Sequence, residues 1–113
     1  MAKKKAELLQ GTLDMLVLRV LKSGAKHGYG IARQIQKSSD SLLVVEEGSL
    51  YPALHRMERK GWIESEWGLS ESNRRAKFYR LTRSGRKQIT TQSGRWDLLV
   101  RAVSGVMLAG EAS

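Results

Sequence analysis

The sequence predicts a mainly α-helical domain that contains a small β-hairpin and ends in a long helix. Three observations predict this class. Apolar residues recur with helical spacing before residue 61, alternate with polar residues from 62 to 81, and return to helical spacing afterwards. The chain has 113 residues, a length that suits one compact unit with a single core.

The charge of the chain predicts an anionic partner. Twenty Lys and Arg residues against eleven Asp and Glu residues give a net charge of +9. Residues 72–96 contain no acid and hold a large share of the cations, at Arg74, Arg75, Lys77, Arg80, Arg83, Arg86, Lys87 and Arg95. Such a basic cluster is typical of nucleic-acid binding, with an anionic membrane surface as the second possibility.

Other classes of protein find little support in the sequence. The apolar runs are much shorter than the roughly 20 residues that a membrane span needs, and no secretory signal is recognisable, so we expect a cytoplasmic protein without a membrane partner. With no cysteine and two histidines, one chain cannot assemble a His/Cys metal cluster, and we expect no metal and no cofactor. The sequence also lacks a P-loop, a dinucleotide-binding glycine pattern and an HExxH motif, which argues against an enzyme.

The first two helices follow from apolar stripes and their boundaries. The first should begin with Thr12 as N-cap and end near Lys22, before Gly24. Its buried stripe should consist of Leu13, Leu16, Val17, Val20 and Leu21. "AELLQ" predicts an earlier helical turn that offers Leu8 and Leu9 for packing. A second, short helix should span roughly residues 28–37.

A third helix is predicted between Ser49, as its N-cap, and Gly61. Pro52 would then be the third helical residue, where a missing N–H costs no intrahelical bond. At about 100° per residue, the inward face should carry Leu50, Ala53, Leu54 and Met57. The opposite face should carry Tyr51, His55, Arg56 and Arg59.

The alternation that follows predicts two antiparallel strands, within "WIESEW" and "KFYRL". The linker "GLSESNRRA" should form a mobile, basic tip. We expect Trp62 and Trp67 to belong to the core and to the base of this hairpin.

Thr82 should cap a last helix that runs to about Leu108. An approximate heptad seam runs along it, comprising Ile89, Trp96, Leu99, Val103 and Val106. Because one small domain can hardly surround so long a helix, the seam predicts contact with a second subunit.

This order of elements predicts a winged helix-turn-helix at residues 1–82, followed by a dimerisation helix at residues 83–113. In that architecture the third helix enters the major groove of DNA and the hairpin, or wing, reaches the backbone or the minor groove.

Three blocks in this order resemble the signature of PadR-type transcriptional regulators, in the short branch with a single C-terminal helix. They are "HGYGI" at 27–31, "GSLYPALHRMERKGWI" at 48–63 and "RRAKFYRLTRSG" at 74–85. One difference is Gly30, where family members often have an acidic residue, which bears on the stability of the second helix.

The resemblance implies a dimeric DNA-binding protein, usually a repressor. It implies that Ser49, Tyr51 and Pro52 meet the operator, and that Arg74, Arg75 and Lys77 of the wing touch phosphate. Some relatives bind flat apolar effectors at the dimer interface, so Trp96 could stack on such a molecule.

Simpler roles remain open for several of these residues. Tyr51 could pack on the preceding helix, Trp96 could serve packing alone, and His55, Arg56 and Arg59 could be solvated or paired residues. The charge alone would also suit a non-specific architectural DNA- or RNA-binding protein, which is the alternative to a sequence-specific regulator.

Overall fold

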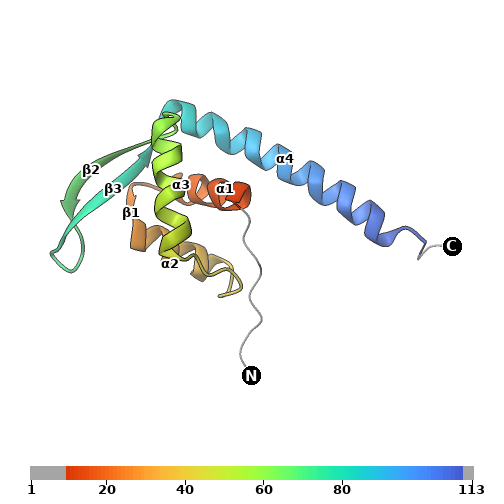
Figure 1. Ribbon diagram of the computed structural model, residues 1–113, viewed down its shortest axis with the longest axis horizontal. Helices are drawn as coiled ribbons and strands as arrows, with labels where there is room; N and C mark the ends of the chain where they lie inside the picture. The colour runs from red at the N-terminus through yellow and green to blue at the C-terminus, as the bar shows by residue number, and fades with distance from the viewer. Residues whose placement is uncertain (1–9, 111–113) are drawn as a thin grey trace, which may run out of the picture.

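The computed structural model describes residues 10–110, which form four helices and a three-stranded sheet (Figure 1). Helix α1 spans Gln10–Leu21. Thr12 therefore lies within the helix, and its predicted role as N-cap is wrong. The helix ends as expected before Gly24, whose φ of +138° favours glycine. Leu8 and Leu9 lie outside the described residues.

The core forms where α1 meets α2 (Gly28–Ser38) and α3 (Glu47–Arg59). Three residues of the predicted α1 stripe are buried, while Leu16 and Val20 are partly buried. Helix α2 confirms the prediction and buries Ile31 and Ile35. It forms despite Gly30 because the His27 side chain caps it, with Nδ1 accepting a hydrogen bond from the Gly30 N–H at 3.1 Å.

Helix α3 begins earlier than the sequence predicts. Glu46 occupies the N-cap position without a side-chain capping bond, and its carbonyl oxygen accepts from the N–H groups of Ser49 and Leu50 at 3.0 and 2.9 Å. The prediction of Ser49 as N-cap is therefore wrong. Pro52 is the sixth helical residue rather than the third, where it lacks an N–H that could reach the carbonyl of Gly48.

The sheet has the strand order β1-β3-β2, with β1 at Lys26–His27, β2 at Ile63–Leu69 and β3 at Arg75–Leu81. The two predicted strands are present and antiparallel, and pair from Ile63↔Leu81 to Leu69↔Arg75. Both strands run further than predicted, so the linker shortens to residues 70–74. Strand β1 was not predicted because two residues are too few to show an alternating pattern.

Helix α4 spans Arg83–Leu108, as predicted, and begins at an N-cap formed by Thr82. The Thr82 hydroxyl accepts from the Gly85 N–H at 3.0 Å. Gly85 is buried, and a Cβ there would collide with the Trp62 carbonyl oxygen. After this anchored start α4 leaves the rest of the protein and extends away from it (Figure 1).

Candidate nucleic-acid interface

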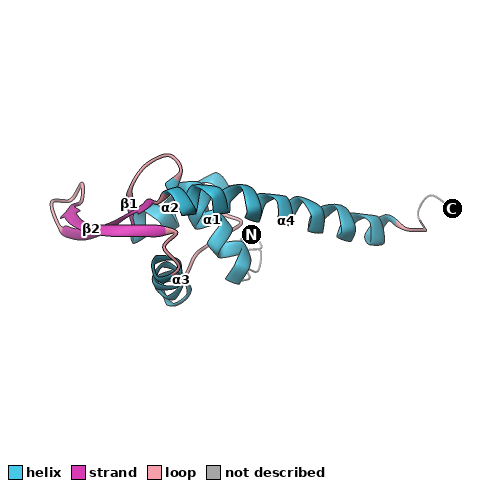
Figure 2. Cartoon of the chain, turned by 90° about the horizontal axis from the view of Figure 1, so that it is seen from above, coloured by secondary structure: helices cyan, strands magenta, loops and turns pink. Residues whose placement is uncertain are grey.

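Helix α3 presents an apolar face to the core and a polar face to solvent. The four residues predicted to face inward are all buried: Leu50, Ala53, Leu54 and Met57. Four residues predicted to contact DNA are exposed on the outward side: Tyr51, Pro52, His55 and Arg59. Seen from above, α3 lies to one side of α2 and α4 (Figure 2). Its outward face is therefore open to a partner molecule.

Tyr51 combines packing with exposure. Its ring lies against the first residue of α2, since a Cβ placed on Gly28 would come within 2.9 Å of the Tyr51 hydroxyl oxygen. The side chain is nevertheless 39% exposed. A glycine at position 28 thus leaves room for a tyrosine that α2 holds in place, and the exposed part of Tyr51 is available to a ligand from a restrained position.

Arg56 lies on another side of α3 and pairs with α1. Its Nη2 atom donates to Oδ1 of Asp14 at 3.0 Å, and the two side chains are 25% and 11% exposed. Burial raises the pKa of Asp14, while the adjacent Arg56 guanidinium lowers it in part. Ser49 is exposed two helical turns before Arg56, on the same flank. The structure therefore does not group Arg56 with Tyr51, His55 and Arg59.

The wing, Ile63–Leu81, carries the three predicted cations, but each has a different setting. Arg74 is exposed in the turn, which is closed by a 2.8 Å bond from the Ser70 N–H to the Arg74 carbonyl oxygen. The Arg75 guanidinium lies 4.8 Å from the centre of the Trp67 ring. Lys77 Nζ lies 4.0 Å from a carboxylate oxygen of Glu58 on α3. Lys77 therefore connects the cations of the wing to α3.

The two tryptophans of the hairpin differ in burial. Trp62 is partly buried and packs against the core, as expected. Trp67 is 58% exposed, so its predicted place in the core or wing base is wrong. The strand leaves the core after Ser65, and Trp67 shares the inward-facing side of the strand at a point where no core remains beneath it.

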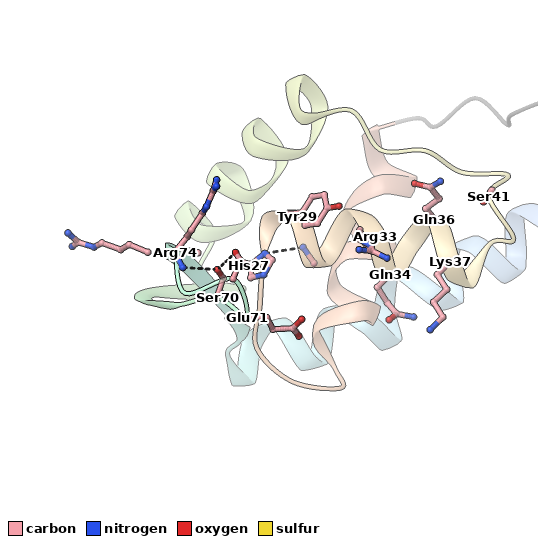
Figure 3. Close-up of a pocket in the computed structure, with 14 residues that line it drawn as sticks. His27, Tyr29, Arg33, Gln34, Gln36, Lys37, Ser41, Ser70, Glu71 and Arg74 are labelled. Atoms are coloured by element: carbon pink, nitrogen blue, oxygen red, sulfur yellow. Dashed lines mark hydrogen bonds between the residues drawn. The ribbon is translucent and has the colours of Figure 1, made fainter.

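An open groove of about 1000 Å³ lies between α2 and the wing turn (Figure 3). Its α2 wall includes Tyr29, Arg33 and Lys37, and its wing wall includes Arg74 and Arg75. The Arg33 guanidinium lies 5.7 Å from the centre of the Tyr29 ring. This groove therefore brings cations of α2 and of the wing together, with the acid Glu71 of the wing turn among them.

The α2 cations were absent from the predicted site, although a signal for them exists. Tyr29, Arg33 and Lys37 recur at intervals of four, which places them on one helical face. No comparable signal in the sequence indicates that Asp14 forms an ion pair with Arg56, because the two residues lie 42 positions apart.

Helix α4 carries apolar side chains that its own chain leaves exposed. Four of the predicted seam residues are between 42% and 75% exposed: Trp96, Leu99, Val103 and Val106. Ile89 differs, because it is partly buried against the core of its own chain. The seam open to another molecule therefore begins after Ile89.

The part of the chain that the structure describes contains neither a candidate metal site nor a candidate membrane-spanning helix. Residues 10–110 contain no group of three His, Cys, Asp or Glu side chains that could hold a metal ion. Within the same residues, no helix is long and apolar enough to cross a membrane.

Comparison with known proteins shows similarity to transcriptional regulators. The family described as the PadR-like transcriptional regulators matches residues 17–91. A transcriptional regulator from Clostridium thermocellum is 33% identical, with a TM-score of 0.77 over 84% of this chain and 92% of that one. A PadR family regulator from Eggerthella lenta is 30% identical, with a TM-score of 0.75 over 89% and 86% of the two chains.

A protein of uncharacterised function from Lysinibacillus sphaericus is 26% identical over 92 residues, which cover 81% of this chain and 84% of that protein. The family match extends from within α1 to within α4 and includes α3 and the wing. It covers more than half of the chain, and the winged helix observed here agrees with it. The chain therefore belongs to the PadR-like family of transcriptional regulators.

Proposed function

We propose that this protein is a homodimeric, sequence-specific DNA-binding repressor of the cytoplasm. The observation that carries the proposal is the continuity of two surfaces: the exposed face of α3 and the cations of the wing. Lys77 of the wing approaches Glu58 of α3 to 4.0 Å, so both surfaces can meet one duplex.

Helix α3 is suited to the major groove, which is about 12 Å wide and admits a helix. The Tyr51 hydroxyl can donate to a phosphate near the helix N-terminus, where backbone N–H groups attract the same anion. Arg59 lies two turns further along the exposed face and can donate two hydrogen bonds to guanine. His55 lies between them. Arg74 and Lys77 of the wing supply contacts to phosphate.

The exposed seam of α4 supports the proposed dimer. A second copy that packs on the seam would cover Trp96, Leu99, Val103 and Val106, whose exposure is costly for one chain in water. In this arrangement residues 1–82 bind DNA and residues 83–113 join the subunits. Two copies of α3 would then read two half-sites of one operator, about 34–36 Å apart or a multiple of that distance. A dimer seated on a promoter would block transcription.

Trp96 is the residue that we assign to an effector. It is 42% exposed at the start of the open seam, where a flat apolar molecule could enter between subunits and alter the spacing of the α3 helices. A Trp96→Ala variant should lose binding of a flat apolar dye, whereas Trp67→Ala, which removes an exposed tryptophan remote from the seam, should keep it. Equal binding by both variants would remove the effector site.

A titration of selected DNA tests the function itself. Duplexes are enriched from a random library on the wild-type protein, and the best duplex is compared with its scrambled sequence at one salt concentration. We expect a preference of about 10³-fold or more. Equal affinity for the scrambled duplex, or for RNA, would instead favour the non-specific architectural protein. A promoter that contains the selected site should be less active when the protein is present, and higher activity would contradict repression.

Variants of Tyr51 separate its hydroxyl from its packing. Tyr51→Phe retains the ring against Gly28 and removes the donor, while Tyr51→Ala removes both. We expect Tyr51→Phe to weaken operator binding about tenfold through one lost phosphate contact and to leave the unfolding temperature nearly unchanged. Operator binding equal to wild-type in Tyr51→Phe would limit Tyr51 to a packing role.

A further inference from the structure

The two faces of the wing hairpin differ in chemistry. Successive side chains of a strand point to opposite faces, and the register pairs Trp67 with Lys77 and Leu69 with Arg75. One face therefore carries Ile63, Ser65, Trp67, Leu69, Arg75, Lys77, Tyr79 and Leu81. Ser65 donates to a carboxylate oxygen of Glu58 at 2.6 Å, which identifies this as the α3 side of the wing.

The two faces of the hairpin also differ in charge. On strands β2 and β3, which are described throughout, every acid lies on the face away from α3, at Glu64 and Glu66. Arg80 lies on that face too, and its Nε donates to Glu64 at 2.7 Å. The α3 side has Arg75 and Lys77 and no acid of its own strands. Glu58 of α3 approaches Lys77 on this side, so Arg75 is the strand cation that can favour an anionic partner there.

The outer part of the α3 side also exposes apolar groups. Trp67 and Leu69 are 58% and 68% exposed, and the Arg75 guanidinium lies 4.8 Å from the centre of the Trp67 ring. A flat guanidinium that stacks on an indole keeps its direction while its N–H groups stay free to donate. Trp67 thus restrains an arginine that would otherwise be a flexible surface side chain.

The distance of this group from the core indicates which part of DNA it meets. Trp67 and Leu69 lie four and six residues beyond Ile63, or roughly 13 and 20 Å along the strand at about 3.3 Å per residue. The major groove that would hold α3 is about 12 Å wide. If α3 lies in that groove, a group this far along the wing would reach past the bordering phosphate backbone towards the adjacent minor groove.

We propose that Trp67 is a positioning residue that holds Arg75 in the minor groove beside the α3 contact, with Leu69 against the sugar walls. This proposal rests on the DNA-binding function proposed above. A narrow A·T-rich minor groove has an enhanced negative potential that attracts arginine, and apolar side chains can contact its walls. The wing would therefore read groove width, and so prefer A·T-rich flanks, without reading individual bases.

The test uses the selected operator with its central sequence held constant and its flanks changed from A·T to G·C pairs. Wild-type protein should bind the A·T form about tenfold more tightly, within the range that one altered base pair produces. Arg75→Gln should lose most of this preference and make the salt dependence shallower by about one unit of slope. Arg80→Gln is the matched control, because it removes the same charge from the same strand on the opposite face, and it should retain both properties.

Trp67 variants then test positioning. Trp67→Ala should reduce the flank preference several-fold, and Trp67→Phe, which can still stack, should restore most of it. Arg75→Lys retains the charge without the planar guanidinium, so it should keep the salt slope and lose the preference. Since it leaves the exposed indole in place, Arg75→Lys also decides the question if Trp67→Ala fails to fold.

Two results would overturn this inference and leave the proposed function intact. One is a full flank preference in Trp67→Ala or Arg75→Lys, and the other is equal behaviour of Arg75→Gln and Arg80→Gln, in each case with the operator still preferred over its scrambled sequence. If wild-type protein binds operator and scrambled DNA equally, the proposed function itself fails.

Discussion

Helices α3 and α4 both carry an apolar stripe, but only that of α3 is covered by its own chain. Helix α3 has thirteen residues and buries Leu50, Ala53, Leu54 and Met57. Helix α4 has twice as many residues, and Gly85 in its first turn is its one buried residue. Leucines are therefore core residues in α3 and exposed residues in α4.

This difference shows what amphipathic spacing can and cannot establish. The spacing indicates that one face of a helix must leave water, and it does so equally for both helices. It does not indicate which molecule covers that face. For α3 the cover is α1, α2 and the sheet, whereas for α4 beyond Ile89 the described chain supplies none. The comparison can be tested by making equal changes in the two helices.

The largest difference should come from the same truncation in each helix. Leu54 has no exposed surface, so Leu54→Ala should lower the free energy of unfolding by about 2–5 kcal/mol. Leu99 is 54% exposed, and Leu99→Ala should change the stability of the dilute monomer by no more than about 0.5 kcal/mol. Denaturant unfolding measures both. Similar losses in dilute protein would mean that α4 folds back onto its own chain.

A charge on the seam should separate folding from association. Val103 is half exposed in the single chain, so Val103→Asp should leave the monomer folded. In a dimer the new carboxylate would be buried without a partner, and the dissociation constant should rise at least about tenfold. Sedimentation over a range of concentrations measures this shift.

The control for that measurement lies outside the seam on the same helix. Arg101→Asp introduces the same carboxylate at another exposed position of α4, and it should change the dissociation constant less than Val103→Asp does. A monomeric wild-type protein at all concentrations tested would contradict the subunit interface.

The fold could be predicted from sequence wherever local signals decided it. The inward face of α3, the paired strands and the Thr82 cap all follow from spacing or from one residue type. The start of α3 could not be predicted from such signals, because backbone bonds to the Glu46 carbonyl begin the helix without any capping side chain. A prediction based on capping residues selects Ser49 in such a case.

The candidate site was less predictable, since it depends on contacts distant in sequence. Helical spacing placed Arg56 beside the residues predicted to contact DNA, but Asp14 of α1 holds it at 3.0 Å. Trp67 lies on the same face of its strand as the core residue Ile63, yet the strand extends past the core and leaves the ring exposed. Both outcomes depend on how helices and strands are placed relative to one another, and the pattern of residues along the chain does not specify that placement.

The connection between the start of α4 and the residues that follow α3 should give a smaller effect. The Thr82 hydroxyl accepts from the Gly85 N–H and lies 2.6 and 3.1 Å from the carbonyl oxygens of Gly61 and Trp62. Loss of this cap in Thr82→Ala should lower the free energy of unfolding by about 1 kcal/mol. Thr82→Ser keeps the hydroxyl and should retain most of the stability in the same denaturant titration. Equal losses in both variants would assign the effect to the methyl group instead.

The smallest effect concerns the ion pair that joins α3 to α1. Burial raises the pKa of Asp14 above its ordinary value of 3.8, against the lowering effect of Arg56. Because the folded protein then holds the proton more tightly than the unfolded chain, this carboxyl contributes stability below pH 3.8 that is lost as the pH rises through the folded pKa. Asp14→Asn lacks this titration.

We therefore expect the difference in free energy of unfolding, wild-type minus Asp14→Asn, to fall between pH 3.8 and neutral pH. Denaturant unfolding of both proteins at each pH measures the difference, and the shared titration of all other groups cancels in it. A difference that instead grows with pH would show that the Arg56 guanidinium outweighs the burial of Asp14. In that case the pair would stabilise the placement of α3 most strongly at neutral pH, and Arg56 would hold α3 to α1 by charge as well as by packing.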